Sequence, residues 1–405
     1  MTDDKTATLS FPMARAADRP LDPAPELTRL AEGDPVSRVR LWDGSTPWLI
    51  TRHEDVRAVL ADPRVSVDAT QPGFPHTNAV SKTRDTRMKT LMQMDAPDHT
   101  VQRRLLTPEF TVKKMAALRP RIQLIVDDLL GELLAGPRPV DLIEAFALPV
   151  PSRVICELLG VPYADRAFFQ EVARTLVMDE SDPGQALAAG EQLNAYLEDL
   201  VARKDARPGD DLFSMLAVER FRTGAMTSRE IATLGQLLLV AGHDTIAGMI
   251  TLGTIALLTH PDQLRVLRDG DDPAVVAGAV EELLRYLSIT HTEARRVARE
   301  DLEIGGRRIR AGDGIIAVKS TANRDHSAFP EPDALDVRRD ARHHLAFGYG
   351  RHLCLGAPLA RVELQVVFST LFRRVPTLKP ATPPNELVYD ENAIFYTARE
   401  FPVTW

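Results

Sequence analysis

The sequence predicts a single, mainly helical domain with a small β-rich part. One long apolar stretch, residues 228–260, has the length and spacing of a buried helix. Strand-like segments are short and lie mostly between residues 295 and 319. No low-complexity linker interrupts the 405 residues. We therefore expect one domain over residues 21–405, preceded by a flexible N-terminal segment at residues 1–20.

Composition narrows the class of protein. The net charge of -8 argues against a nucleic-acid partner, and no block of like charge suggests a binding tail. The two cysteines, Cys156 and Cys354, imply no disulfide framework, which fits a reducing compartment. The first twenty residues contain no continuous apolar run of the kind found in signal peptides or membrane anchors. We expect a soluble, cytoplasmic protein.

The long helix has clear ends. Thr227 and Glu230 form a capping-box pattern, and Pro261 follows its last turn. About 33 residues at 1.5 Å each give roughly 50 Å, enough to run through the whole molecule. Its middle contains Gln236, His243 and Asp244. Because an Asp at a bilayer centre costs about 2.5 to 3.5 kcal/mol, a buried core helix is the better interpretation than a membrane span.

The midpoint of this helix reads Ala241-Gly242-His243-Asp244-Thr245. A glycine weakens a helix, and a threonine hydroxyl can compete for the carbonyl one turn back. We expect the backbone ladder to open here and leave a gap that can hold oxygen and water. The alternative is that Thr245 only bonds back within a buried helix.

The strands are predicted from short runs of β-forming residues bounded by turn signals. Gly305-Gly306 indicates a tight turn before Arg307. The predicted strands are Pro47 to Thr51, Arg295 to Ile304, Arg307 to Ile309, Gly314 to Lys319 and a segment around Phe395 to Trp405.

The residues from Phe347 to Gly356 form a glycine-rich loop that opens into a helix predicted over Ala357 to Phe372. The positive end of that helix should lower the pKa of the Cys354 thiol, which favours a metal-binding thiolate. Gly348, Gly350 and Gly356 allow a flat cofactor to come close and let amides point at the sulfur. The alternative, a cysteine that is only a small buried hydrophobe, suits Cys156 in its apolar helical pattern.

This loop resembles the haem-binding loop of the cytochrome P450 family. The resemblance implies that Cys354 is the axial ligand to the iron of haem b (iron protoporphyrin IX), with Phe347 packed over the sulfur. Ala241, Gly348 and Gly356 also match positions that contact haem. The similarity covers about residues 20–405 and implies a triangular helical prism with a small β-rich lobe. Haem would lie between the helix bearing Thr245 and the helix after Cys354.

The pentapeptide at Ala241 resembles the oxygen-activation motif of the same family. By that match Thr245 hydrogen-bonds oxygen bound at the iron, and Asp244, where the family often has Glu, belongs to a relay that admits protons. Cleavage of the O-O bond consumes protons at a site otherwise kept dry, so a relay is required.

Two further sets of residues match the family. Glu282 and Arg285, three apart on a helix, resemble its Glu-x-x-Arg motif, which joins an arginine matched by Arg339 and stabilises the core behind the haem. Haem also carries two propionates that need cations. The family's propionate ligands are matched by four residues, of which the first two lie four apart on one helical face: His99, Arg103, Arg296 and His352.

The resemblance implies a monooxygenase that inserts one atom of O2 into a C-H bond of an apolar small molecule such as a polyketide, terpenoid or xenobiotic. The chain has no GxGxxG opening a βαβ unit and no cysteine cluster, so a separate ferredoxin and ferredoxin reductase, drawing on NAD(P)H, are implied. We expect a monomer. The ferredoxin should dock near Cys354 on five cations: Arg104, Lys113, Lys114, Arg351 and Arg361.

Three alternatives have the same loop. A peroxide-driven peroxygenase tends to lack the acid and alcohol found at Asp244 and Thr245. A non-enzymatic haem-thiolate sensor and a plain binding protein are the others.

The substrate pocket is expected to come from segments that vary most in the family. Among their polar residues, Glu293 and Arg84 either orient a polar group or face water. The segments are Val65 to Met94, Phe168 to Asp179, Gln185 to Tyr196, Leu237 to Thr245, Ile289 to Ala294 and Asn392 to Tyr396.

Overall fold

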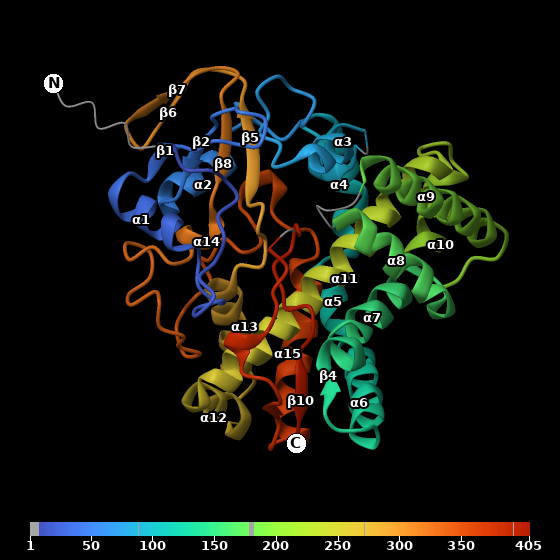
Figure 1. The fold of residues 1–405 in the computed structure, drawn as a ribbon. Helices are drawn as coiled ribbons and strands as arrows, with labels where there is room; N and C mark the ends of the chain where they lie inside the picture. The colour runs from blue at the N-terminus through green and yellow to red at the C-terminus, as the bar shows by residue number, and fades with distance from the viewer. Residues whose placement is uncertain (1–7, 88, 178–181, 271, 392) are drawn as a thin grey trace.

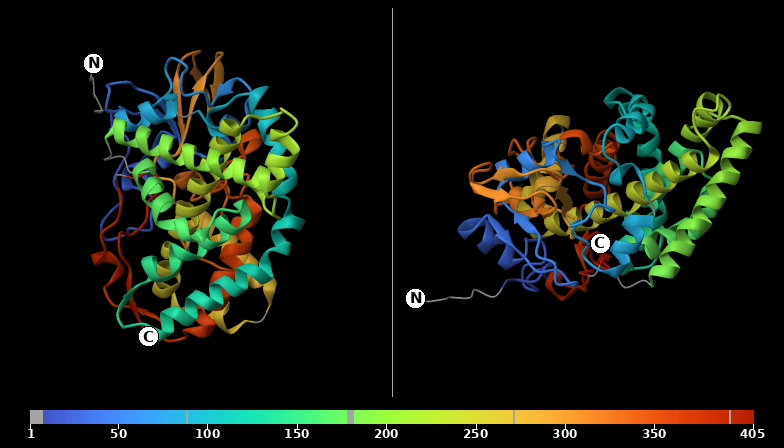
Figure 2. Two further views of the ribbon diagram at one scale, coloured as in Figure 1. Left: turned by 90° about the vertical axis from the view of Figure 1, so that its right-hand side faces the viewer. Right: turned by 90° about the horizontal axis from the view of Figure 1, so that it is seen from above.

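The computed structural model describes residues 8–87, 89–177, 182–270, 272–391 and 393–405. Most strands gather at one end of the molecule with α1 (Pro25–Gly33) and α2 (His53–Ala61), and helices fill most of the rest (Figure 1). The strands β4 (Val140–Asp141) and β10 (Pro402–Thr404) lie at the opposite end, near the C-terminus. Two turned views show the same division (Figure 2). This arrangement confirms the predicted mainly helical fold with a small β-rich lobe.

The α-helices have these bounds: α1 (Pro25–Gly33), α2 (His53–Ala61), α3 (Ala79–Arg87), α4 (Asp98–Leu106), α5 (Val112–Ala117), α6 (Arg119–Ala135), α7 (Pro149–Leu159), α8 (Arg166–Val177), α9 (Pro183–Ala206), α10 (Leu212–Leu216), α11 (Ser228–Thr259), α12 (Pro261–Asp269), α13 (Pro273–Leu287), α14 (Lys319–Ala322) and α15 (Ala357–Arg374).

The strands have these bounds: β1 (Val36–Arg38), β2 (Trp48–Ile50), β3 (Val65–Ser66), β4 (Val140–Asp141), β5 (Ala294–Ala298), β6 (Leu302–Ile304), β7 (Arg307–Ile309), β8 (Gly314–Ala317), β9 (Lys379–Pro380) and β10 (Pro402–Thr404). The largest sheet has the order β1-β2-β8-β5-β3, in which only β2 and β8 pair in parallel. The β4, β10 and β9 strands form a second sheet, and β6 and β7 a hairpin.

The predicted strands are confirmed with three adjustments. The strand predicted over Gly314 to Lys319 ends at Ala317, and Lys319 begins α14. The segment Arg295 to Ile304 divides into β5 and β6, because the chain leaves the large sheet between them to form the hairpin. Gly305 and Gly306 have φ angles of 53° and 74° and make the predicted turn. Near the C-terminus only Pro402–Thr404 forms a strand, while Phe395 makes an isolated bridge to Thr290.

Helix α11 crosses the middle of the molecule and organises the core (Figure 1). The capping box at Thr227 and Glu230 is present. A Cβ at Gly253 would lie 2.4 Å from the Phe368 ring, so this glycine lets α15 pack closely on α11. In the described part of the chain α11 alone is long and apolar enough to cross a membrane, and 67% of its most apolar window is buried inside the protein. It is a core helix, as predicted.

The Glu282, Arg285 and Arg339 cluster joins α13 to the irregular segment before the Cys354 loop. Arg285 donates to both carboxylate oxygens of Glu282 at 2.7 and 2.8 Å, and Arg339 Nε lies 3.2 Å from Glu282 Oε1. Both Glu282 and Arg285 have no exposed surface. Removing one partner from such a buried network leaves an unpaired charge, so the cluster fixes the segment behind the loop.

Two expectations are corrected. Described residues of the segment expected to be flexible are packed: Phe11 and Met13 are buried, and Ser10 bridges to Arg40. Their apolar side chains join a small core with Leu27, which the polar start of the chain did not suggest. The helix backbone at Ala241–Thr245 is also unbroken, because the Thr245 hydroxyl bonds back to Ala241 without opening a gap.

Candidate functional site

Cys354 is presented by a tightly folded loop at the start of α15. Gly348 and Gly350 have φ angles of 75° and 72°, and a Cβ at Gly350 would lie 2.7 Å from the Leu60 carbonyl oxygen. The Cys354 amide donates to the Phe347 carbonyl at 2.9 Å and closes the loop. Cys354 retains exposed surface, so its sulfur is accessible to a ligand.

The amides at the start of α15 lower the pKa of the Cys354 thiol, as expected, but the pKa is raised overall in the protein alone. Burial raises this pKa, and it outweighs the backbone amides of Gly356 and Ala357 and the charges of Arg103 and Lys319, which all lower it. The surrounding protein thus disfavours a free thiolate. A cation at the sulfur would offset this cost, since metal ions deprotonate coordinating thiols.

The four residues predicted to meet haem propionates form one group of basic side chains. The rings of His99 and His352 lie 4.1 Å apart between centroids. The Nε2 atoms of both are buried and have no hydrogen-bond partner. Within the described ranges, Arg296 has no carboxylate within 4.0 Å, and its guanidinium donates to the Arg295 carbonyl at 2.8 Å. Arg103 interacts favourably with Cys354.

The pKa values in this group show the effect of unpaired charge. Burial lowers the pKa of Arg296 to about 10. Burial also lowers the pKa of His352 to about 3, and Arg296, His99, Arg351 and Arg103 add to the shift. Groups of one sign that repel each other in a buried position need an anion.

This donor set fits haem. Two propionates would satisfy the unpartnered Nε2 atoms and the Arg296 guanidinium, and the sulfur of Cys354 is an accessible ligand for iron. A single flat molecule that carries a metal ion at its centre and carboxylates at one edge would supply both the anions for the basic side chains and the metal for the sulfur.

Lys319 is a cation that the sequence analysis missed. Its Nζ donates to Thr290 Oγ1 at 3.0 Å, and the field of Arg296 acts on it. Burial lowers its pKa, Arg296 adds to the shift, and Glu293 and Cys354 oppose it. No motif marks Lys319, because only the pairing of β5 with β8 brings its segment beside Arg296.

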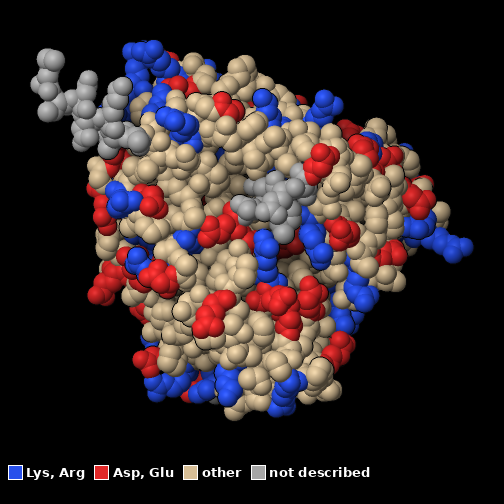
Figure 3. Space-filling view, viewed as in Figure 1, with Lys and Arg blue, Asp and Glu red and all other residues tan. Residues whose placement is uncertain are grey.

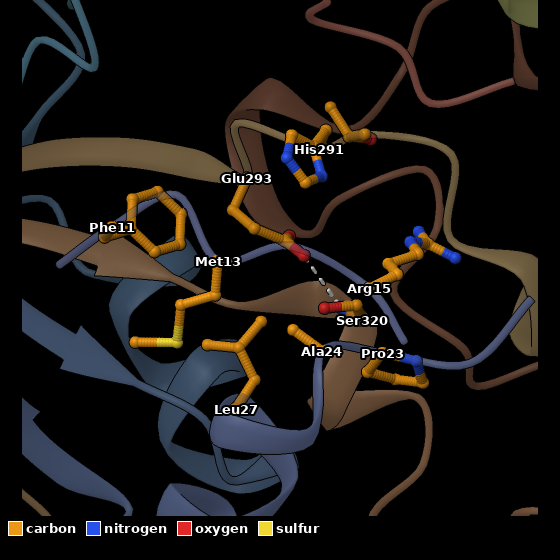
Figure 4. Close-up of a pocket in the computed structure, with 10 residues that line it drawn as sticks. Phe11, Met13, Arg15, Pro23, Ala24, Leu27, His291, Glu293 and Ser320 are labelled. Carbon is orange, nitrogen blue, oxygen red and sulfur yellow. Dashed lines mark hydrogen bonds between the residues drawn. The ribbon is translucent and has the colours of Figure 1, made fainter. Parts of the chain in front are cut away.

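Glu293 supports Lys319 through the backbone. Its φ is 54°, and its carboxylate accepts hydrogen bonds from the amides of Lys319 at 2.8 Å and Ser320 at 3.2 Å. Figure 4 shows this carboxylate directed at Ser320, with His291 and Arg15 nearby. Glu293 was expected either to orient a polar group of the substrate or to face water. It does neither here, because it is buried and accepts hydrogen bonds from the protein's own backbone.

The α11 residues combine an acid and an alcohol. The Thr245 hydroxyl donates to the Ala241 carbonyl at 2.6 Å. Asp244 Oδ1 lies 2.9 Å from His243 Nδ1, while Asp244 Oδ2 and His243 Nε2 are buried without a hydrogen-bond partner. One carboxylate oxygen is therefore available to a water molecule or a proton.

A second acid, Glu281, organises the surface beside Cys354. Arg361 donates to both its oxygens at 2.6 and 2.8 Å, and His344 Nε2 lies 3.2 Å away. Although burial opposes it, these partners lower the pKa of Glu281 to about 2. Arg361 also stacks 4.8 Å from the Phe347 ring centroid. The sequence analysis missed Glu281, since its partners lie far along the chain.

A surface pocket of about 290 Å³ lies next to this network. Leu353 and Tyr349 are exposed within it, and Arg57 donates to the Tyr349 hydroxyl at 2.9 Å. The lining residues are Arg57, Arg342, His343, His344, Phe347, Gly348, Tyr349, Leu353 and Arg361.

The chain is similar to known proteins over its whole length. The family model "Cytochrome P450" matches residues 191–387. Cytochrome P450-SU2 of Streptomyces griseolus is 49% identical over 407 residues, covering 100% of both chains. Pentalenic acid synthase of Streptomyces avermitilis is 47% identical over 409 residues, again covering 100% of both.

A solved structure agrees. The mycinamicin VIII C21 methyl hydroxylase MycCI of Micromonospora griseorubida, bound to mycinamicin VIII, is 39% identical and superposes with a TM-score of 0.92 over 98% of this chain and 100% of that one. Full-length identity near one half, together with the accessible Cys354 and the unpaired cations beside it, establishes that the chain belongs to the bacterial cytochrome P450 monooxygenases, whose cofactor is a haem-thiolate.

Proposed function

We propose that this monooxygenase hydroxylates an apolar small molecule at a C-H bond, using haem b, O2 and electrons from a ferredoxin. The observation that carries the proposal is the accessible sulfur of Cys354 beside two arginines without carboxylate partners, Arg103 and Arg296, and two histidines with unpartnered Nε2 atoms, His99 and His352. When bound, haem supplies the chemistry that activates oxygen.

The protein's own residues hold and orient that cofactor. Cys354 would ligate the iron, and Phe347, Gly348 and Gly356 would pack near the sulfur. Ala241 of α11 would also contact the cofactor. The propionates would be bound by His99, Arg103, Arg296 and His352. The Nε2 atoms of both histidines are buried donors that lack a partner, and Arg296 donates only to the Arg295 carbonyl among the bonds described.

Asp244 and Thr245 transfer protons from solvent to the reaction site. The unpartnered Oδ2 of Asp244 receives a proton from solvent, and the Thr245 hydroxyl passes one toward the oxygen substrate. For this the hydroxyl must turn from the Ala241 carbonyl, a rotation about χ1 that threonine allows in a helix. The presence of both groups favours an O2-dependent reaction over the peroxygenase alternative.

The substrate is proposed from the relatives. One is named for pentalenic acid and another was solved with mycinamicin VIII, and both names point to secondary metabolism. A polyketide, terpenoid or xenobiotic would suit the apolar side chains of Leu237, Val240 and Ile289, which lie in segments expected to form the pocket and are partly buried against the core. Met88 and Met178 belong to two of the segments expected to form the pocket, Val65 to Met94 and Phe168 to Asp179, and lie outside the described residues.

Electrons are proposed to arrive at the pocket beside Cys354. Two of the five cations expected to bind the ferredoxin are already paired within the protein. Arg361 forms an ion pair with Glu281, and Lys114 forms one with Glu109. Arg57, Arg104, Lys113 and Arg351 have no carboxylate within 4.0 Å among the described residues, so they suit an acidic ferredoxin. Positive and negative side chains are interspersed on the face of the molecule in Figure 3.

We also propose that the protein is a cytoplasmic monomer.

Reconstitution tests the proposal. With NADPH, ferredoxin and reductase, the protein should add one atom of isotopically labelled O2 to a macrolide or terpenoid library member. Product from hydrogen peroxide alone, with none from the electron chain, would identify a peroxygenase. Ligand binding with no product under either condition would favour a sensor or a binding protein.

A further inference from the structure

Lys319 is a basic residue beside the candidate site to which no role has yet been given. Its ammonium group donates one hydrogen bond, to Thr290 Oγ1 at 3.0 Å. Within the described ranges no carboxylate lies within 4.0 Å of this group. An ammonium group has three N-H donors, so two remain for another acceptor. The side chain is only partly exposed, and a charge in such a position needs an anion close to it.

The register of the large sheet places Lys319 on the same face as Arg296. Strands β5 and β8 are antiparallel, and Ala294 lies opposite Ala317. Arg296 is two residues beyond Ala294, and Lys319 is two residues beyond Ala317, with extended backbone between at Val318. Because side chains alternate along a strand, both cations project to the same side, one on each side of the central pair.

Lys319 also lies within the electrostatic reach of Cys354. Burial is the largest cause of both pKa shifts, lowering the pKa of Lys319 and raising that of Cys354. Each group opposes the shift of the other, as expected for a cation near a thiol that can become a thiolate. Arg296 acts on Lys319 as well. A cation that interacts with both the sulfur and Arg296 borders the region in which we propose that haem lies.

Glu293 fixes the backbone of Lys319 without pairing with its side chain. The Glu293 carboxylate accepts hydrogen bonds from the amides of Lys319 at 2.8 Å and Ser320 at 3.2 Å (Figure 4). These bonds hold the start of α14 against β5, so the base of the Lys319 side chain has a fixed position. The ammonium group therefore stays available to an anion other than Glu293.

We propose that the ammonium group of Lys319 binds a propionate of haem together with Arg296, and that its positive charge raises the reduction potential of the iron. This inference rests on the proposed function. Reduction adds one negative charge to the cofactor, and a fixed cation in a site of low dielectric constant stabilises the reduced form. Lys319 would thus favour the uptake of an electron from the ferredoxin.

The first test is a redox titration of the haem-loaded protein without substrate. Lys319→Gln keeps a donor for Thr290 but removes the charge. The equilibrium constant for reduction should fall by about tenfold, which corresponds to a potential about 59 mV more negative for a one-electron step. Lys319→Arg keeps the charge and should stay near the wild type. Arg310→Gln is the matched control, because Arg310 is an exposed cation in the turn before β8.

The second test asks whether the partner of Lys319 is a propionate. Haem transfer from Lys319→Gln to an excess of apomyoglobin should be roughly tenfold faster than from the wild type, since a charge-assisted hydrogen bond is lost. The two proteins are then reconstituted with haem whose propionates are methyl esters. The difference in transfer rate between them should disappear, because the carboxylate that Lys319 binds is gone.

Two results would overturn the proposal. One is a potential in Lys319→Gln equal to that in Arg310→Gln, and the other is a difference in transfer rate that persists with the esterified haem. If Lys319→Gln bound no haem, uptake by Lys319→Arg would support the proposal, while failure of both variants would assign Lys319 to the fold and overturn it. A wild-type protein without the reduced carbon monoxide spectrum of a thiolate ligand would instead contradict the proposed function.

Discussion

The imidazole rings of His99 and His352 lie 4.1 Å apart, and the Nε2 atom of neither has a hydrogen-bond partner in the described part of the chain. A buried imidazole from α4 and a partly buried one from the turn before Cys354 thus lie together with buried Nε2 atoms that do not bond to each other. Such donors cost free energy unless a ligand completes them. Haem propionates are the groups that we expect there.

The first prediction is that His352→Ala loses haem faster than the wild type. Transfer of haem to an excess of apomyoglobin should accelerate by roughly tenfold, the ratio that corresponds to the loss of one charge-assisted hydrogen bond of about 1.4 kcal/mol. His326→Ala is the control, since this exposed histidine lies outside the site. Equal transfer rates in both variants would remove His352 from the haem-binding set.

The second prediction concerns pH and Glu281. Its pKa falls from 4.5 to about 2 through Arg361 and His344. A depressed pKa in the folded state gives stability that is present above pH 4.5 and is lost as the pH falls toward 2. The shift corresponds to about 3 kcal/mol as an upper bound, since Arg361 is partly exposed to solvent.

Glu281→Gln should therefore be less stable than the wild type at pH 7 and should show a flatter loss of stability between pH 4.5 and 2. Denaturant unfolding at several pH values measures this. If the free energy of unfolding of Glu281→Gln had the same pH dependence as that of the wild type, the pKa of Glu281 would not be depressed in the folded protein.

The third prediction concerns proton delivery. Thr245→Ala removes the hydroxyl and leaves Asp244 in place, so NADPH use should continue while product per NADPH falls and hydrogen peroxide release rises. Asp244→Asn should instead slow turnover, because the buried Oδ2 that accepts the proton is lost. Thr251→Ala is a control, since its hydroxyl bonds back in the same way one turn and a half further along α11. If the product formed per NADPH were unchanged in Thr245→Ala, the Thr245 hydroxyl would have no part in proton delivery and would serve only in its hydrogen bond to the Ala241 carbonyl.

The fourth prediction concerns the electron donor. Charge reversal at Arg57 or Arg351 should slow reduction by ferredoxin, and added salt should do the same for the wild type by screening. Lys379→Glu, an exposed cation in β9 outside the pocket, is the control. Arg361 is unsuitable for this purpose, because reversing it would expel a partner of Glu281. If neither charge reversal nor added salt changed the reduction rate, the surface beside Cys354 would not be the docking site of the ferredoxin.

The sequence predicted those features that local patterns carry. Thr227 and Glu230 marked the start of α11, Gly305 and Gly306 marked the hairpin, and the glycines around Cys354 marked the loop. Each depends on neighbours within a few residues. The joining of Glu282, Arg285 and Arg339 was accessible only through the family resemblance.

Other features depend on distant contacts, and local patterns did not reveal them. No local pattern marks Glu281, which meets Arg361 because α15 and α13 pack together. Asp85 and Arg295 lie in unrelated segments and meet only because α3 folds over β5. The pKa of Cys354 is raised overall, because helix position indicated the effect of nearby amides and could not show the larger effect of burial.

The most direct test of the account is the absorption spectrum of the reduced carbon monoxide complex in Cys354→Ser and Cys156→Ser. Cys354 is accessible at the start of α15, whereas Cys156 is 2% exposed and burial raises its pKa to about 12. The account predicts that the Soret band of thiolate-ligated haem disappears in Cys354→Ser and stays in Cys156→Ser. Retention of that band in Cys354→Ser would contradict the assignment of Cys354 as the iron ligand.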